Sequence, residues 1–221
     1  NIFSRENQEK MAVLSILING ASAYAIYHIT PAFPFAFTAC VFANMHGLLG
    51  LIQCFKTGRC EPNQIRDIST SIIQILPLPL INIELYRQSG NNFAMGHAFF
   101  LIPLIFDLIA RLLTEDGEDS STTMLKDLTI LGNIASLTYL GVNNDKSRYL
   151  LMALAATCSR FGSMAMEHFG DIDGRNAVLF FDTMFYALAG IEHSLIITDF
   201  ETNGSFKWIF SPDTTFFHLV S

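Results

Sequence analysis

Long apolar segments, separated by short polar or proline-containing stretches, predict a set of helices along the chain. Sustained alternation of apolar and polar residues, which strands would need, is nearly absent, and no Asn-Gly or Asp-Gly hairpin joins two β-branched runs. We therefore predict an all-α fold, a compact bundle of about seven helices. The predicted helices cover residues 8–28, 34–56, 64–86, 94–113, 122–142, 147–168 and 176–199.

The boundaries of these helices follow from particular residues. Pro31 and Pro34 separate the first two helices because proline lacks an amide donor and biases the residue before it away from helical geometry. An acidic loop near 114–121 separates two of the later helices. We expect residues 1–221 to form a single helical domain that ends in a short irregular tail over 200–221.

The distribution of charged residues indicates whether the helices lie in a lipid bilayer or in water. Only 15% of the residues are charged, against about 25% in ordinary soluble domains, and residues 11–55 contain no Asp, Glu, Lys or Arg. Two uncharged helices of about 20 residues have the length needed to cross a hydrocarbon core of about 30 Å. We therefore favour a polytopic membrane protein. The alternative is a soluble, secreted helical bundle with an apolar ligand cavity.

Polar stripes on the last two predicted helices bear on the same choice. In water such stripes face solvent, whereas in lipid they must face the interior of the bundle, because a charged side chain in hydrocarbon is costly. The two stripes consist of Ser159, Arg160, Ser163 and Glu167 on one helix and Asp182, Tyr186 and His193 on the other.

Several functional classes are excluded or disfavoured. The net charge of −7 argues against nucleic acid, which needs clustered Lys and Arg. A nucleophile-elbow sequence, a P-loop, an H-E-x-x-H sequence and a dinucleotide glycine pattern are all absent, so no familiar enzyme class is supported. We predict no metal site and no cofactor, and we disfavour haem between His46 and His97 because a lone histidine on an apolar face is more often a hydrogen-bonded core residue.

The candidate binding residues are polar and aromatic side chains inside the apolar segments. Asp107 and Arg111 stand four residues apart on one helical face and are expected to pair. Glu192 is expected simply to reach water. The candidate ligand-binding set is His46, His97, Asp107, Arg111, Asp182, Tyr186, His193, Phe42, Phe100 and Phe185.

Taken together, these patterns predict an integral membrane helical bundle that accommodates or transports an apolar small molecule such as a lipid, sterol, isoprenoid or pigment. The first alternative is a secreted soluble carrier or storage protein for lipid or pigment. The second is a membrane enzyme that modifies lipids through buried histidines and carboxylates. The expected partners are the apolar molecule and membrane lipid, and an oligomer is left open.

Two covalent modifications are also predicted. Cys54 and Cys60 bracket a short turn, so they can close a disulfide in an oxidising compartment. Asn203 begins the acceptor triplet Asn-Gly-Ser for N-glycosylation.

Overall fold

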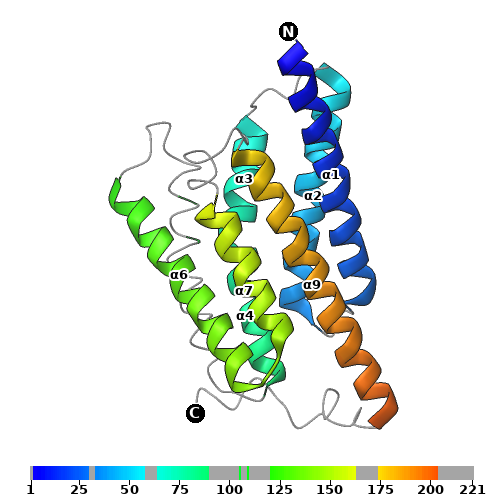
Figure 1. Cartoon of the computed structure of the whole chain (residues 1–221), viewed down its shortest axis with the longest axis vertical. Helices are drawn as coiled ribbons and strands as arrows, with labels where there is room; N and C mark the ends of the chain where they lie inside the picture. The colour runs from blue at the N-terminus through cyan, green and yellow to red at the C-terminus, as the bar shows by residue number, and fades with distance from the viewer. Residues whose placement is uncertain are drawn as a thin grey trace.

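A computed structural model of the chain describes residues 2–29, 33–57, 64–89, 105, 109, 120–162 and 174–203. Every regular element in these ranges is a helix, which confirms the all-α prediction (Figure 1). The helices are α1 (Ile2–His28), α2 (Pro34–Thr57), α3 (Gln64–Ile75), α4 (Pro77–Gln88), α6 (Ser120–Asn143), α7 (Ser147–Arg160) and α9 (Gly174–Asn203).

Six of the seven predicted ranges match helices whose bounds the structure gives, but the boundaries differ in places. The range 94–113 lies outside the described residues except for Ile105 and Ile109, which are helical. α7 ends at Arg160, before the predicted limit of 168, and the N–H of Phe161 bonds back to the carbonyl of Thr157. α9 continues to Asn203, four residues into the range predicted as an irregular tail.

The predicted helix 64–86 is in fact broken at Leu76, between α3 and α4. The cause is the Pro77-Leu-Pro79 sequence, because proline has no N–H to donate to the carbonyl four residues before it. The carbonyls of Ile73 and Ile75 therefore lose their helical donors. The hydrogen-bond ladder resumes at once, since the N–H of Leu80 donates to the carbonyl of Leu76 over 3.2 Å.

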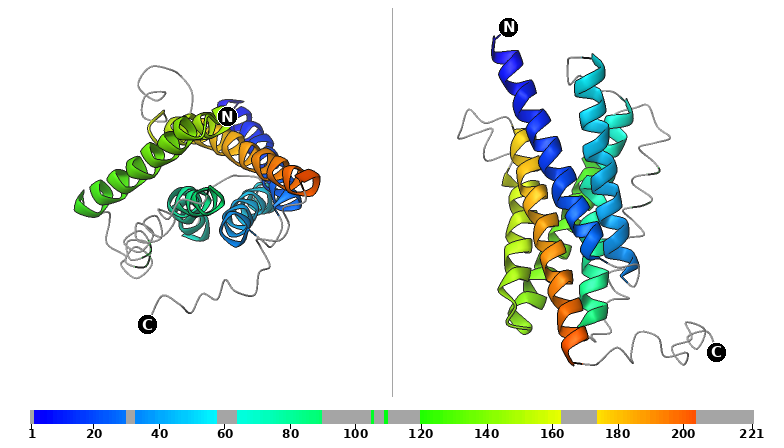
Figure 2. Two further views of the ribbon diagram at one scale, coloured as in Figure 1. Left: turned by 90° about the horizontal axis from the view of Figure 1, so that it is seen from below. Right: turned by 90° about the vertical axis from the view of Figure 1, so that its right-hand side faces the viewer.

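The helices pack as an arc around α4. α1 contacts α2 and α9, α7 contacts α9 and α6, and α4 contacts α2 and α6. Seen along the bundle, α4 lies inside the arc that the other helices form (Figure 2). All residues of α4 from Pro77 to Tyr86 are buried, as expected for a helix in the interior of the bundle.

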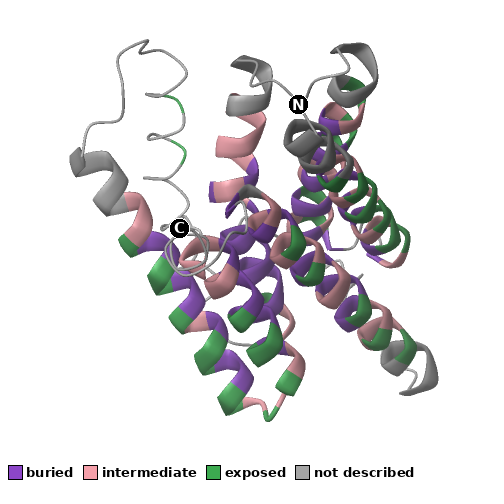
Figure 3. Ribbon diagram, turned by 45° about the horizontal axis from the view of Figure 1, so that its top comes forward, coloured by how far each residue is buried: buried purple, intermediate pink, exposed green. Residues whose placement is uncertain are grey.

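Apolar side chains cover much of the outside of this bundle, and polar side chains lie within it. Tyr27, Leu128 and Val142 are 84%, 64% and 68% exposed, while Glu84 and Glu192 are fully buried. Figure 3 shows the exposed positions along the outer faces of the helices. Four helical segments are long and apolar enough to cross a membrane: Lys10–His28, Pro34–Ile52, Ile68–Gln88 and Asn176–Thr198.

α1 and α2 approach each other closely along small and polar residues. A Cβ on Gly47 would lie 2.6 Å from the side-chain nitrogen of Asn19, so a larger residue there requires the Asn19 side chain to move. Nearby, the Asn44 amide donates to the hydroxyl of Ser22 over 3.2 Å. Small residues and hydrogen bonds between helices are how helices associate in lipid, where the hydrophobic effect does not drive them together.

The buried carboxylate of Glu84 on α4 satisfies the first turn of α2. Its Oε2 accepts the backbone N–H of Phe35 over 3.1 Å, and its Oε1 lies 2.9 Å from the guanidinium of Arg87. The first N–H groups of a helix have no partner within the helix, so this contact acts as a cap supplied from a neighbouring helix.

We expect Glu84→Leu to lower the free energy of unfolding by about 1–2 kcal/mol, the usual effect of losing a helix cap. Glu84→Gln retains an acceptor oxygen for Phe35 and should cost less. Urea or SDS titration of the detergent-solubilised protein measures both values. Equal destabilisation by the two substitutions would contradict a capping role.

Candidate functional site

A small cavity lies between α3, α4, α7 and α9. Its volume is about 20 Å³, which is room for roughly one ordered water. The residues around it come from α3 and α4, which follow each other in the sequence, and from the distant α7 and α9, so only the packed bundle creates it. The lining residues are Ile73, Gln74, Pro77, Leu78, Ala156, Ser159, Arg160, Asp182, Phe185 and Tyr186.

One wall of the cavity is polar and charged. The hydroxyl of Ser159, in the last turn of α7, donates to Oδ1 of Asp182 over 2.6 Å. Asp182 and Tyr186 stand four residues apart on α9 and therefore share the face that looks at α7. The guanidinium of Arg160 interacts electrostatically with the carboxylate of Asp182, but the two groups form no direct ion pair.

The remaining part of the cavity lining is mainly apolar and comes largely from α3 and α4. Ile73 and Leu78, on either side of the break at Leu76, line the cavity together with Phe185 of α9. The cavity thus combines hydrocarbon, a cation, a carboxylate and hydroxyl groups within a few ångströms.

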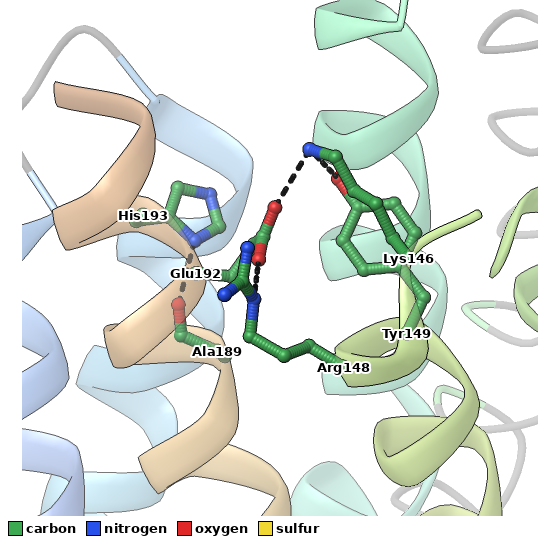
Figure 4. A network of polar contacts seen from close by, with 6 residues as sticks. All are labelled: Lys146, Arg148, Tyr149, Ala189, Glu192 and His193. Atoms are coloured by element: carbon green, nitrogen blue, oxygen red, sulfur yellow. Dashed lines mark hydrogen bonds and ion pairs between the residues drawn. The ribbon is translucent and has the colours of Figure 1, made fainter. Parts of the chain in front are cut away.

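A second polar cluster lies further along α9 (Figure 4). The buried carboxylate of Glu192 accepts from Lys146 Nζ over 2.8 Å and from Arg148 Nε over 2.5 Å. Lys146 also donates to the hydroxyl of Tyr149 over 3.3 Å. These contacts hold the start of α7 and the turn before it against α9.

The charge of Lys146 is stabilised in this cluster. Burial by itself lowers the pKa of the ammonium group, but the hydrogen bond to Glu192 and the interactions with Tyr149 outweigh burial, so the pKa lies above its usual value. Lys146 therefore remains charged throughout the neutral range. Its neighbour in the turn, Asp145, has a positive φ of 53°, a conformation that Asp tolerates better than most residues.

His193 points away from the ion pairs and has one nitrogen without a partner. Its Nδ1 lies 2.8 Å from the carbonyl of Ala189, and because a carbonyl only accepts, Nδ1 carries the proton. Nε2 is buried and makes no hydrogen bond. The ring packs edge-on against Phe33, with 5.3 Å between the centroids.

The structure brings together some of the residues singled out in the sequence and separates others. Asp182, Phe185 and Tyr186 line one cavity. His193 stands seven residues beyond Tyr186, about 10 Å along the helix. His46 lies on α2, where its Nδ1 is 2.9 Å from the hydroxyl of Ser69.

The remaining predictions lie elsewhere or are untested. Phe42 is half-buried on α2 and does not line the cavity. His97, Phe100, Asp107, Arg111 and Cys60 lie outside the described residues, as do the side chains of Cys54 and Asn203. Within the part of the chain that the structure describes, no three His, Cys, Asp or Glu side chains are grouped to hold a metal ion.

The sequence interpretation overlooked some polar residues and misplaced one. Arg160 and Ser159 were seen as part of a stripe but not as site residues, and their place at the C-terminal end of α7 was concealed because the predicted helix extended to 168. The expectation that Glu192 reaches water is wrong, since it is fully buried between Lys146 and Arg148. The sequence did contain a signal for this burial: Lys146 and Arg148, two cations at the start of α7, are available to pair with a buried carboxylate.

Comparison with known proteins identifies a family for this chain but gives no activity. No curated protein and no solved structure matches the chain significantly. One family model matches residues 31–192, a range that begins shortly before α2, ends at Glu192 on α9 and includes every residue that lines the cavity. Because this match covers most of the chain, the protein belongs to the family described as a domain of unknown function (DUF4791).

Proposed function

We propose that the protein is an integral membrane helical bundle that binds an apolar small molecule carrying a polar group, with that group in the cavity between α3, α4, α7 and α9. The observation that carries the membrane part is the reversed distribution of side chains. Glu84, Asn82 and Glu192 are buried, while large apolar side chains are exposed over α1, α2, α6 and α7. Lipid accepts such a surface, whereas water does not.

The shape and chemistry of the cavity support the ligand part. At about 20 Å³ it admits a small polar group but not a sterol ring or a pigment, so the hydrocarbon part of a ligand must lie between the helices or in the bilayer. The polar wall of Ser159, Arg160 and Asp182 fits the head of such a molecule. The apolar wall of Ile73, Leu78 and Phe185 fits the start of its chain.

The two alternatives are less well supported. A secreted soluble carrier would expose Tyr27, Leu128 and Val142 to water without a partner. A lipid-modifying enzyme that pairs a buried histidine with a carboxylate would need the two groups together. Asp182 and His193 stand eleven residues apart on α9, about 16 Å along its axis, so they do not form one acid–base site.

Membrane integration is tested by fractionation. We expect the full chain to stay in the membrane pellet after washing with alkaline carbonate and to enter solution only with detergent. The physical reason is the apolar surface of the four candidate spans. Release by carbonate would show that the protein is peripheral or soluble.

Ligand binding is tested by what purifies with the protein. We expect mass spectrometry of an organic extract of the detergent-purified protein to show an amphiphile at near-stoichiometric amount. Phe185→Trp fills the cavity and should remove this ligand, whereas Phe180→Trp, on the exposed side of the same helix, should not. A single sharp size-exclusion peak for both variants confirms that they fold, and identical extracts would contradict the assignment of the cavity.

A further inference from the structure

Arg160 lines the cavity, and its guanidinium has no hydrogen-bond partner among the described residues. Its guanidinium carries five N–H donors, yet within the described part of the chain it makes no direct hydrogen bond or ion pair. The charges that act on it from a greater distance are those of Asp182, Tyr186 and Asp127. Every other described cation in this half of the bundle, Lys146 and Arg148 included, has a carboxylate in contact or another recorded interaction.

We propose that Arg160 binds the oxyanion, phosphate or carboxylate, in the headgroup of an amphiphile, with one oxygen of that group inside this cavity. This inference rests on the proposed function and names the chemical class of its ligand. A guanidinium presents paired N–H groups that match the two oxygens of a carboxylate or phosphate. The Tyr186 hydroxyl, which has no hydrogen bond to any described residue, lines the same cavity and supplies a further donor.

Asp182 restricts which anion fits. Its Oδ1 already accepts the Ser159 hydroxyl over 2.6 Å, so the carboxylate is held in place beside the guanidinium. A ligand oxygen on Arg160 therefore lies near a fixed negative charge, and each additional negative charge on the ligand is repelled. Headgroups with one negative charge, a phosphodiester or a carboxylate, are favoured over the doubly charged phosphomonoester.

The apolar wall distinguishes a headgroup from a free ion. Ile73, Leu78 and Phe185 form an apolar part of the cavity lining, and they offer a free phosphate ion no hydrogen bond from a side chain. The same side chains gain contact with the first carbons of an acyl chain. An amphiphile therefore makes contacts with both the polar and the apolar lining residues, whereas inorganic phosphate binds only the polar ones.

Binding to the full chain in detergent micelles tests this proposal. The probes are palmitoyl lysophosphatidylglycerol and palmitate, each with one negative charge, uncharged monopalmitoylglycerol, and inorganic phosphate. We expect the two anionic amphiphiles to bind about ten- to a hundredfold more tightly than monopalmitoylglycerol, the effect of charge-assisted hydrogen bonds. Arg160→Gln should remove this preference and leave the affinity for monopalmitoylglycerol unchanged. Arg148→Gln, a matched loss of one arginine from α7 outside the cavity, should retain it.

The outcomes separate the two proposals. If no amphiphile binds, charged or uncharged, the proposed function fails. If all three amphiphiles bind equally and Arg160→Gln has no effect, only the assignment to Arg160 is overturned. Inorganic phosphate that binds as tightly as the anionic amphiphiles would show a site for a free ion, which also overturns it.

Two further variants keep the test decisive. If Arg160→Gln does not fold, Arg160→Lys retains the charge but loses the paired donors and should weaken the anionic preference several-fold. Asp182→Asn removes the fixed negative charge and should raise the affinity for palmitoyl lysophosphatidic acid, a phosphomonoester, relative to lysophosphatidylglycerol. An unchanged ratio of these two affinities would exclude Asp182 from selecting the headgroup charge.

Discussion

Replacing both Lys146 and Arg148 with methionine is expected to lower the free energy of unfolding by about 3–5 kcal/mol, because it leaves the buried carboxylate of Glu192 without a cationic partner. Either cation alone still contacts one carboxylate oxygen, so each single substitution should cost much less than the pair. Unfolding of the detergent-solubilised protein in an SDS titration, followed by circular dichroism, measures these differences.

The control is to remove the buried carboxylate of Glu192 as well. Adding Glu192→Leu to the Lys146→Met and Arg148→Met variant should recover most of the lost stability, since replacing a whole buried ion pair with apolar residues is often nearly neutral. A triple variant no more stable than the double one would show that the cations act through packing and not through Glu192.

The same cluster has a defined dependence on pH. Because the pKa of Lys146 is raised in the folded protein, its contribution to stability is complete below the ordinary lysine value and is lost as the pH rises through the higher folded value. The contribution of Lys146 therefore stays constant through the neutral range and declines only under alkaline conditions.

Gly190→Val is expected to destabilise the protein by about 2–3 kcal/mol through the contact between α1 and α9. A Cβ at Gly190 would lie 2.9 Å from the Cα of Ala25 and 3.0 Å from the ring of Tyr24. Because the nearest atom belongs to the backbone, no side-chain rotation relieves the contact and the two helices must separate. Thermal unfolding in detergent, read by size-exclusion chromatography after heating, measures the change.

A matched glycine provides the control for this substitution. Gly132 is exposed on α6, and a Cβ there would meet nothing within 4 Å. Gly132→Ala should be neutral or stabilising by up to about 1 kcal/mol, since alanine favours helix over glycine. If Gly190→Val behaved like Gly132→Ala, the close approach of α1 and α9 would not exist.

The helices themselves could be predicted from the sequence because each is an uninterrupted apolar run of sufficient length. α1 and α2 match the predicted ranges 8–28 and 34–56 closely, with the extra residues of α1 at its polar start. The break at Leu76 was missed although Pro77 and Pro79 were visible. Proline inside an apolar run either kinks a helix or ends it, and packing around α4 decides which.

The site was less predictable because proximity between helices leaves little trace in one sequence. The spacing of Asp182 and Tyr186 correctly placed them on one face, but it also placed His193 there, and only the axial distance separates them. The contact between Ser159 and Asp182 joins residues 23 positions apart on different helices. Nothing in the local pattern around Arg160 indicates that it faces the same cavity.

The contact between α1 and α9 has a consequence for how the protein is made. The ribosome delivers α1 early and α9 only after all the other described helices, so the face of α1 that holds Ala25 must wait for most of translation before Gly190 covers it. Lys146 and Arg148 also leave the ribosome before Glu192, which follows 46 and 44 residues later. The last helix to emerge therefore both closes the bundle and neutralises the turn before α7, so premature termination before α9 would leave a chain that lacks both contacts.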